Sequence, residues 1–205
     1  MKENFQNDVE MNMPVQFKVG DLISEDGFFE FCQMNDDALD FERDKNGNII
    51  TMSPSGSLTG NFVSNILIYF GSWLLREKIP GKVFDSSTGF TLPNSAVRAP
   101  DIAWIKLDRW AVLPEDDKEK FAHICPDFVI EVRSKSDSVA YLKNKMQEYL
   151  ENGCELGWLI DRFEQRVYIY QPNQSVIEHR HFNFQLSGKP LFPGFEINLS
   201  KLENS

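Results

Sequence analysis

The sequence predicts a mixed α/β protein of the α+β class, in which helices flank a mixed sheet. Two kinds of segment indicate this class. Short runs of β-branched and aromatic residues, such as Phe128–Arg133, are typical of strands. Residues 61–78 and 138–151 instead repeat apolar residues with the period of a helix. With 205 residues, 41% of them hydrophobic, the chain can form one domain with a sizeable core.

The N-terminal region is predicted to begin with an arm and a helix. Residues 1–20 show little periodicity, so we expect a loose arm there and a single domain over residues 21–205. Ser24 is a residue type that caps helices, and it precedes a helix predicted over Glu25–Met34.

A hairpin is predicted after this helix. Its arms are residues 39–43 and 48–52, and Asn46-Gly47 between them tolerates the positive φ of a tight turn. Glu42 on the first arm is an acidic candidate for a site. A solvent-facing strand residue is the favoured interpretation of Glu42.

The middle of the chain is predicted to supply a long helix and several strands. A loop of small residues over 55–60 leads into the helix 61–78, which Pro80-Gly81 ends. Two later strands open with Pro-Asp, at Pro100 and at Pro126. Short strands at 82–84 and 89–92 and a surface excursion at 106–125 complete this region.

A second helix is predicted over residues 138–151. Asp137 is its expected N-cap, and Gly153 stands where a left-handed C-terminal cap belongs. Lys145 falls on or beside the apolar stripe of this helix. Its stem can cover apolar surface while its ammonium reaches water, or its ammonium can point into a site at the end of the Glu131 strand.

The C-terminal region is predicted to add strands. Residues 156–161 and 167–171 form a hairpin, and residues 190–199 are expected as a final strand across the core. His179 and His181 alternate on a polar strand, where two histidines could bind a metal. Because no third ligand is evident nearby, a solvated strand face is the favoured interpretation.

The composition limits the class of protein. A net charge of −10 argues against strong binding to nucleic acid, because phosphate binding needs a basic surface. Residues 1–60 carry −8 of that charge and the rest only −2, which leaves room for a local basic groove. The start of the chain lacks an apolar signal-peptide core, and the most apolar run, residues 62–75, is too short to span a bilayer. Cys32, Cys125 and Cys154 are scattered and are interpreted as reduced thiols, so we expect a cytoplasmic protein with no membrane partner.

The strand Phe128–Arg133 carries the strongest candidate site. Side chains alternate along a strand, so Glu131 and Arg133 share a face. On so apolar a strand they need each other, a metal ion or an anionic ligand to avoid a large desolvation cost. If this strand pairs with the one after Pro100, Asp101 and Glu131 converge at one end of a sheet. Two carboxylates suit a hard divalent cation, although an ordinary ion pair fits the spacing as well.

The wider sequence resembles a known nuclease family. Asp101 followed by Glu131-Val132-Arg133 resembles the PD-(D/E)XK nuclease signature, with Arg133 at the position of its lysine. Residues 41–170 are similar to the Uma-type restriction-endonuclease family, long known as a domain of unknown function and abundant in cyanobacteria. The blocks that carry this similarity are, in the family's order, SSTGFTLPNSAVRAPDIAWI, CPDFVIEVRSKSD, KMQEYLENG and LGWLID.

The resemblance implies a restriction-endonuclease-like core with an extra N-terminal hairpin and extra C-terminal strands. It implies hydrolysis of DNA with Mg²⁺, for which Mn²⁺ can substitute. Asp101, Glu131 and the carbonyl of Val132 would be the metal ligands. Arg133 and Lys145 would be the catalytic cations, and because arginine stays protonated, Lys145 with a lowered pKa is expected to supply the amine. DNA would be a weakly bound substrate of a homodimer, since such nucleases address two strands.

Two other functions stay open at this point. The nuclease fold can serve as a non-catalytic binding or assembly module, in which Arg133 neutralises Asp101 and Glu131 and magnesium does not bind. Paired carboxylates also hydrolyse glycosides. That reaction is disfavoured because a cation beside Glu131 would lower a pKa that a general acid needs raised, and nothing resembles a sugar platform.

Overall fold

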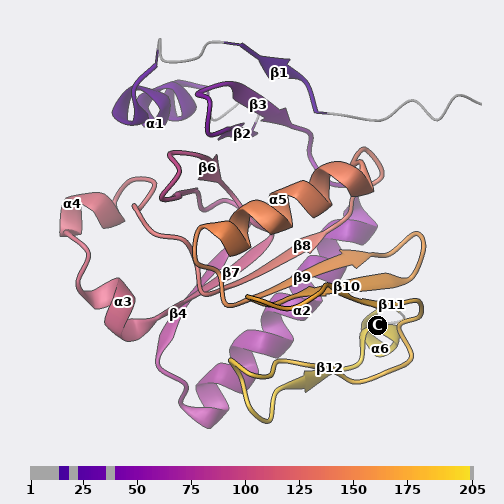
Figure 1. Cartoon of the computed structure of the whole chain (residues 1–205). Coiled ribbons are helices and arrows are strands. Elements are labelled where there is room, and N and C mark those ends of the chain that lie inside the picture. The colour runs from indigo at the N-terminus through magenta and orange to yellow at the C-terminus, as the bar shows by residue number, and fades with distance from the viewer. Residues whose placement is uncertain (1–13, 19–22, 36–39, 204–205) are drawn as a thin grey trace, which may run out of the picture.

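The computed structural model describes residues 14–18, 23–35 and 40–203. Over these residues the chain forms a six-stranded sheet, a five-stranded sheet and a two-stranded ribbon, with helices packed on them (Figure 1). This arrangement confirms the predicted mixture of strands and flanking helices.

The six-stranded sheet forms the centre of the molecule. Its order is β11-β10-β9-β8-β7-β4, and within it only β8 and β9 run parallel. Every residue of β8 and β9 is buried, which is why both strands are apolar runs without a polar face. The strands are β4 (Gly81–Asp85), β7 (Ile102–Lys106), β8 (Phe128–Val132), β9 (Leu156–Asp161), β10 (Arg166–Tyr170) and β11 (Ile177–His179).

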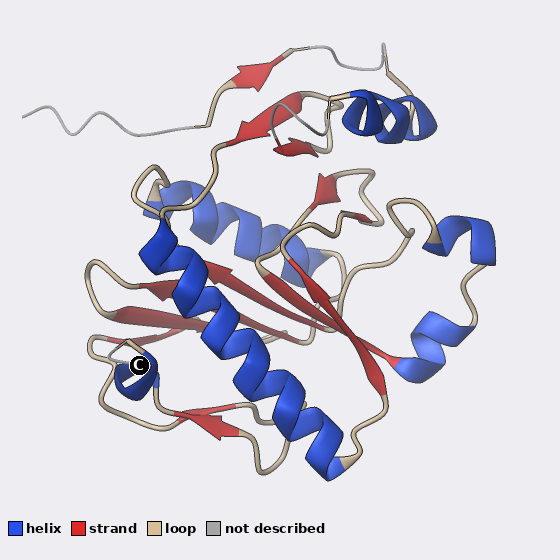
Figure 2. Cartoon of the chain, turned by 180° about the vertical axis from the view of Figure 1, so that it is seen from behind, coloured by secondary structure: helices blue, strands red, loops and turns tan. Residues whose placement is uncertain are grey.

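One long helix covers each face of this sheet (Figures 1 and 2). On one face, α2 (Ser57–Glu77) buries an aromatic-rich stripe against the strands. On the other, α5 (Val139–Glu151) buries Leu142, Met146 and Tyr149. Glu131 has the same parity in β8 as Val129, whose side chain packs with α5, so Glu131 faces α5.

The ends of these helices correct two predictions. α2 begins at Ser57, one turn before the predicted start, because the small residues expected to form a loop continue the helix from the N-cap Gly56. The N-cap of α5 is Ser138, whose Oγ accepts a hydrogen bond from Tyr141 N. Asp137 was wrongly predicted for this position. Its carboxylate instead accepts a hydrogen bond from Ser134 N at 2.8 Å.

By length and composition, α2 is the one helix among residues 14–18, 23–35 and 40–203 that could cross a membrane. The helix is longer than the run of 62–75 judged from the sequence. A helix buried in a protein core passes the same test, and the stripe of α2 that includes Phe62, Ile66 and Phe70 is buried here against the sheet.

The N-terminal region forms a second layer beside α5 (Figure 1). Its five-stranded sheet has the order β1-β3-β2-β6-β5. The Ser24 cap and the hairpin around Gly47, whose φ is +81°, are as predicted. Most of the expected loose arm lies outside the described residues, but Gln16–Phe17 pairs with β3. The elements are β1 (Gln16–Phe17), α1 (Glu25–Met34), β2 (Asp40–Arg43), β3 (Ile49–Met52), β5 (Phe90–Thr91) and β6 (Val97–Arg98).

The remaining elements are short. The final strand predicted over 190–199 is limited to Glu196–Ile197, because Phe192 and Phe195 fill the core from a loop. His179 ends β11 and His181 lies beyond it, so the two histidines do not share a strand. These elements are α3 (Leu107–Ala111), α4 (Glu115–Lys118), β12 (Leu186–Ser187), β13 (Glu196–Ile197) and α6 (Leu199–Leu202).

Candidate active site

Asp101 and Glu131 meet at one end of the six-stranded sheet. β7 and β8 are antiparallel with Ile102 opposite Ile130, so the same register places Asp101 opposite Glu131. Asp101 Oδ2 accepts a hydrogen bond from Val132 N at 2.6 Å. The predicted convergence of these two carboxyl groups is therefore confirmed.

Lys145 reaches the same place from α5. Its Nζ lies 2.6 Å from Glu42 Oε1 and 2.8 Å from Glu131 Oε1. It also donates a hydrogen bond to the carbonyl of Ala99 at 3.2 Å. The side chain is only 1% exposed, so the interpretation in which the ammonium reaches water is wrong. The lysine points into the site.

Glu42 is fully buried, which corrects its interpretation as a solvent-facing residue. Arg98 Nη1 donates to Glu42 Oε2 at 2.9 Å, and Ala99 N donates to Glu42 Oε1 at 3.0 Å. The pairing of β2 with β6 brings these groups together, because Arg43 lies opposite Val97. The N-terminal sheet thus adds a carboxylate to a site built mainly by the central sheet.

Four further polar residues complete the cluster, and the sequence analysis singled out none of them. Arg98 Nε donates to Glu148 Oε2 at 2.6 Å. Tyr149 Oη donates to Glu131 Oε1 at 3.1 Å, and Tyr141 Oη donates to Glu42 Oε2 at 3.5 Å. Along α5, the spacing of Tyr141, Glu148 and Tyr149 from Lys145 is three or four residues. Residues at that spacing lie on one side of a helix, so their polar end groups can gather there. This pattern in the sequence could have revealed the cluster.

Burial shifts the pKa values of the two carboxyl groups upward. Desolvation raises the pKa of Glu131 to about 8, although Lys145 opposes the shift. Desolvation also raises the pKa of Asp101 to about 6, against the hydrogen bond from Val132 N and the charge of Lys145. Solvent still reaches part of Asp101. At neutral pH Asp101 is therefore mostly ionised and Glu131 mostly protonated, and a further cation at this place would favour the anionic form of both.

The pKa values of Glu42 and Lys145 shift so that each group keeps its charge. Desolvation alone would raise the pKa of Glu42, but Lys145 and Arg98 together lower it. Desolvation alone would lower the pKa of Lys145, but the charges of Glu131 and Glu42 raise it. The expectation of a lysine with a lowered pKa is therefore wrong. Lys145 is an ammonium ion throughout the working pH range.

The free oxygens of Asp101 and Glu131 suit a hard cation. Among the described residues, no donor reaches Asp101 Oδ1 or Glu131 Oε2. Arg133 N donates to Ile160 O, so the preceding carbonyl of Val132 faces the Asp101 side of β8. The described residues contain no group of three His, Cys, Asp or Glu that could hold a metal. Two carboxylates, a carbonyl and several waters are nevertheless a coordination shell that Mg²⁺ accepts.

Arg133 lies beyond the end of β8 and contacts other groups. Its Nη1 lies 3.0 Å from Asp161 Oδ2, and its Nε donates to the carbonyl of Asp137 at 3.2 Å. Its guanidinium also lies 5.4 Å from the ring of Phe163. The structure therefore places the ammonium of Lys145, and not Arg133, against Glu131.

Comparisons with known proteins identify the family and the fold of the chain. The sequence matches the Uma2 family, described as "Putative restriction endonuclease", over residues 27–200. The structure is similar to the crystal structure of a putative nuclease belonging to DUF820 from Anabaena variabilis, with a TM-score of 0.69 and 21% identity over 80% of this chain and 89% of that one. No match was found among curated proteins. The predicted family and its fold are confirmed.

Proposed function

Because the chain belongs to the Uma2 family, we propose that it is a magnesium-dependent endonuclease that hydrolyses phosphodiester bonds in DNA. One observation carries the proposal. The ammonium of Lys145 is buried against Glu131, at the end of the sheet where Asp101 lies opposite. A fixed cation beside two carboxyl groups can stabilise the charge that develops on a phosphoryl group.

Three residues would form the metal site, and two hydrogen bonds would orient its carboxylates. Asp101, Glu131 and the Val132 carbonyl would hold Mg²⁺, which supplies a Lewis acid and a bound water of lowered pKa. Val132 N fixes Asp101 through Oδ2, and Tyr149 fixes Glu131 through Oε1. These hydrogen bonds leave Asp101 Oδ1 and Glu131 Oε2 as the oxygens that would bind the ion.

Lys145 would stabilise charge rather than abstract a proton. Its raised pKa keeps it protonated, so it cannot serve as a general base in this environment. Glu42 is a positioning residue, since it accepts from Lys145 on one oxygen and is held by Arg98 on the other. The N-terminal hairpin thereby sets the place of the catalytic cation.

Cleavage of plasmid DNA tests this function. Supercoiled plasmid incubated with the protein and Mg²⁺ or Mn²⁺ should become nicked or linear, and EDTA should stop the reaction. Glu131→Gln keeps the shape of the side chain and should remove the activity. Cleavage that persists in EDTA, or that is equal in Glu131→Gln, would contradict the proposal.

A non-catalytic binding or assembly module is the second candidate. It is favoured by the ion pairs within the cluster, since Lys145 pairs with Glu42 and Glu131, and Arg98 pairs with Glu42 and Glu148. Arg133, which pairs with Asp161, would not be the neutralising cation. A protein of this kind should show no change in melting temperature when magnesium is added.

DNA binding is expected to be weak and steeply dependent on salt. The chain carries a net charge of −10, so any binding depends on a local basic surface and is screened readily. Fluorescence anisotropy with a short duplex, measured from low to physiological salt, checks this prediction. Deleting residues 1–20 should change the affinity little. Tight binding at high salt would contradict the electrostatic picture.

Arg133→Lys is expected to preserve cleavage to within about fivefold, the effect of about 1 kcal/mol. Lysine keeps a positive charge near Asp161 and restores the usual residue of the nuclease signature. It loses the contacts of the guanidinium with Asp137 O and Phe163. The plasmid assay and a melting curve measure both effects. A loss of 10²-fold or more in a folded variant, the size expected for a catalytic group, would give Arg133 the role assigned to Lys145.

We also propose that the protein works as a cytoplasmic homodimer. The two strands of a duplex require two cuts, and Cys32, Cys125 and Cys154 are free thiols. Light scattering should give twice the chain mass of 23.7 kDa. A mass equal to that of one chain would contradict the dimer.

A further inference from the structure

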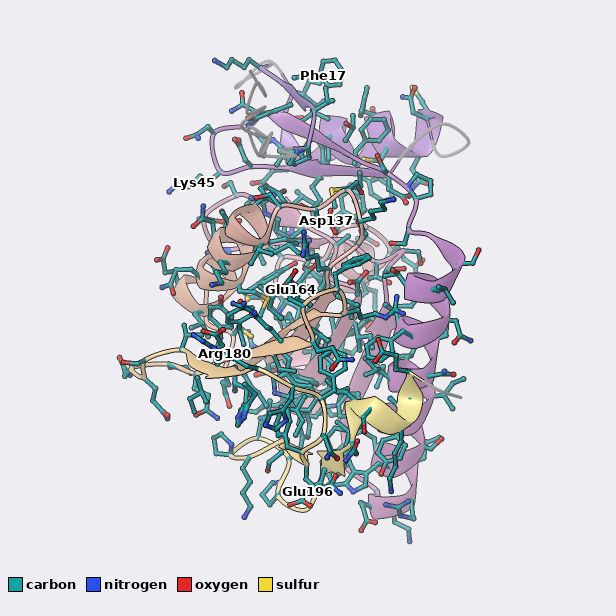
Figure 3. The ribbon with its side chains drawn as sticks, turned by 90° about the vertical axis from the view of Figure 1, so that its right-hand side faces the viewer. Phe17, Lys45, Asp137, Glu164, Arg180 and Glu196 are labelled. Atoms are coloured by element: carbon teal, nitrogen blue, oxygen red, sulfur yellow. The ribbon has the colours of Figure 1, made fainter. Side chains whose placement is uncertain are left out.

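A cavity lies at the same end of the central sheet as Asp101 and Glu131, on the side of α2. Its volume is about 330 Å³, and its walls come from the first turn of α2, the loop after β8 and the turn after β9. Since β8 and β9 are parallel, the segments that follow them emerge at one end of the sheet. Figure 3 looks onto this end, where Asp137 and Glu164 are labelled.

Two cations line this cavity without a carboxylate partner among the described residues. Lys135 is exposed and forms no ion pair within residues 14–18, 23–35 and 40–203, and the partners of Arg162 there are neutral. Arg162 Nη1 donates to Thr59 Oγ1 at 3.3 Å, and its Nε is buried with no acceptor. The charge of this guanidinium is not neutralised by a carboxylate, so it favours an anion in the cavity that Arg162 lines.

The first turn of α2 adds backbone donors to the same cavity. Gly56 caps the helix without a side-chain hydrogen bond, and the first turn contains no acidic residue. The first amide groups of a helix, here those of Ser57 and Leu58, have no acceptor within the helix and carry a partial positive charge. The start of a helix of 21 residues therefore faces the same space as Arg162 and Lys135.

The cavity also has apolar walls. The side chain of Leu58 is 76% exposed and that of Phe163 is 50% exposed, although both residues are large and hydrophobic. The guanidinium of Arg133 lies 5.4 Å from the ring of Phe163. A simple inorganic anion would gain nothing from these walls, whereas a nucleotide presents a base and a sugar beside its phosphate.

We propose that this cavity binds one unpaired nucleotide of the DNA strand, close to the bond that is cut. Its phosphate contacts Arg162, Lys135 and the first amides of α2, and its base packs on Phe163 and Leu58. The inference rests on the proposed nuclease function, because it makes the cavity a subsite of the same strand. Glu164 in the same turn lies 4.0 Å from Arg166 and does not line the cavity.

Binding of a labelled thymidine oligonucleotide of about twelve residues, a common length for single-strand sites, tests the subsite. Fluorescence anisotropy is measured at low salt in EDTA, so that no cleavage occurs. Ser57→Glu, Lys135→Ala and Phe163→Ala should each raise the Kd by about fivefold or more. Matched controls are Ser72→Glu, an exposed position on the same helix, and Lys82→Ala, an exposed lysine on β4. Both controls should leave the Kd within about twofold.

Ser57→Glu separates binding from folding. A carboxylate at the start of a helix is favourable for the helix, so the melting temperature should hold or rise while binding falls. Equal affinities for Ser57→Glu and Ser72→Glu, or no binding by the unaltered protein, would overturn the subsite. Plasmid cleavage with Mn²⁺ reports separately on the nuclease. If plasmid DNA is cleaved but the variants bind the oligonucleotide as the unaltered protein does, only the subsite is contradicted. If the variants lose binding as expected but the unaltered protein does not cleave plasmid DNA, only the nuclease function is contradicted.

Discussion

Lys145→Met is expected to lower DNA cleavage by roughly 10²-fold or more and to lower the free energy of unfolding by about 3 kcal/mol. Methionine keeps most of the apolar stem but removes the ammonium that lies 2.6 Å from Glu42 and 2.8 Å from Glu131. Breaking a buried ion pair typically costs about 3–5 kcal/mol. We expect the lower end of this range for Lys145→Met, because Glu42 still forms its ion pair with Arg98 and Glu131 can become neutral by taking up a proton.

The loss of cleavage has a separate cause. A preorganised cation acts on the charge of the transition state, and removing one such group typically costs about 10²–10³-fold in rate. Because the pKa of Lys145 is raised, the activity of the unaltered protein should show no fall at low pH that could be assigned to this lysine.

A second variant separates stability from catalysis. Lys145→Met combined with Glu42→Gln removes both charges of the buried pair and leaves Arg98 paired with Glu148, so part of the lost stability should return, while cleavage should stay low. Urea denaturation and the plasmid assay measure the two effects. Full cleavage by a folded Lys145→Met variant would show that another residue supplies the catalytic positive charge. An unchanged free energy of unfolding in the single variant would contradict the buried ion pair.

The sequence contains enough local information to find part of this site. Asp101 directly precedes the apolar strand β7 and Glu131 lies in β8, so the antiparallel pairing of these two strands is sufficient to bring them together. Lys145 stands three residues after Leu142 and four before Tyr149, so the helical period alone places it on the buried side of α5.

The rest of the site depends on contacts that are distant in sequence. Glu42 lies on a strand of four residues, where alternation alone cannot say which face is buried, and the pairing of β2 with β6 decides it. Alternation assigned Arg133 the same face as Glu131. The strand, however, ends at Val132, and the neighbouring β9 brings Asp161 within reach of the guanidinium. The raised pKa of Lys145 likewise depends on two carboxylates that arrive from different elements.

Asp101→Asn combined with Glu131→Gln is expected to abolish the stabilisation of the protein by magnesium. If Asp101 and Glu131 hold the ion, a concentration of Mg²⁺ of 100 times its Kd raises the free energy of unfolding by about 2.7 kcal/mol. The ion must displace protons from carboxyl groups whose pKa values are about 6 and about 8. The stabilisation by magnesium should therefore grow as the pH rises through that range.

The same variant should change how the metal-free protein responds to pH. The pKa of Glu131 rises from an ordinary value of 4.5 to about 8 in the folded state, and that of Asp101 rises from 3.8 to about 6. Between these values the folded state holds more protons than the unfolded state, so the free energy of unfolding falls as the pH rises. For Glu131 the fall from pH 4.5 to pH 8 should be on the order of 2 kcal/mol, allowing for its coupling to Lys145.

Melting curves of four samples decide the matter, namely the unaltered protein and the double variant, each with and without magnesium. The double variant lacks both titrating carboxyl groups, so its stability should not show the fall between pH 4.5 and pH 8, and magnesium should not raise its melting temperature. Glu164→Gln, which removes an exposed carboxylate whose side chain is 60% accessible, should behave like the unaltered protein. An equal magnesium shift in the double variant would place the ion elsewhere. No shift in any sample would favour the non-catalytic module, because the same fold would then hold its buried charges without a metal.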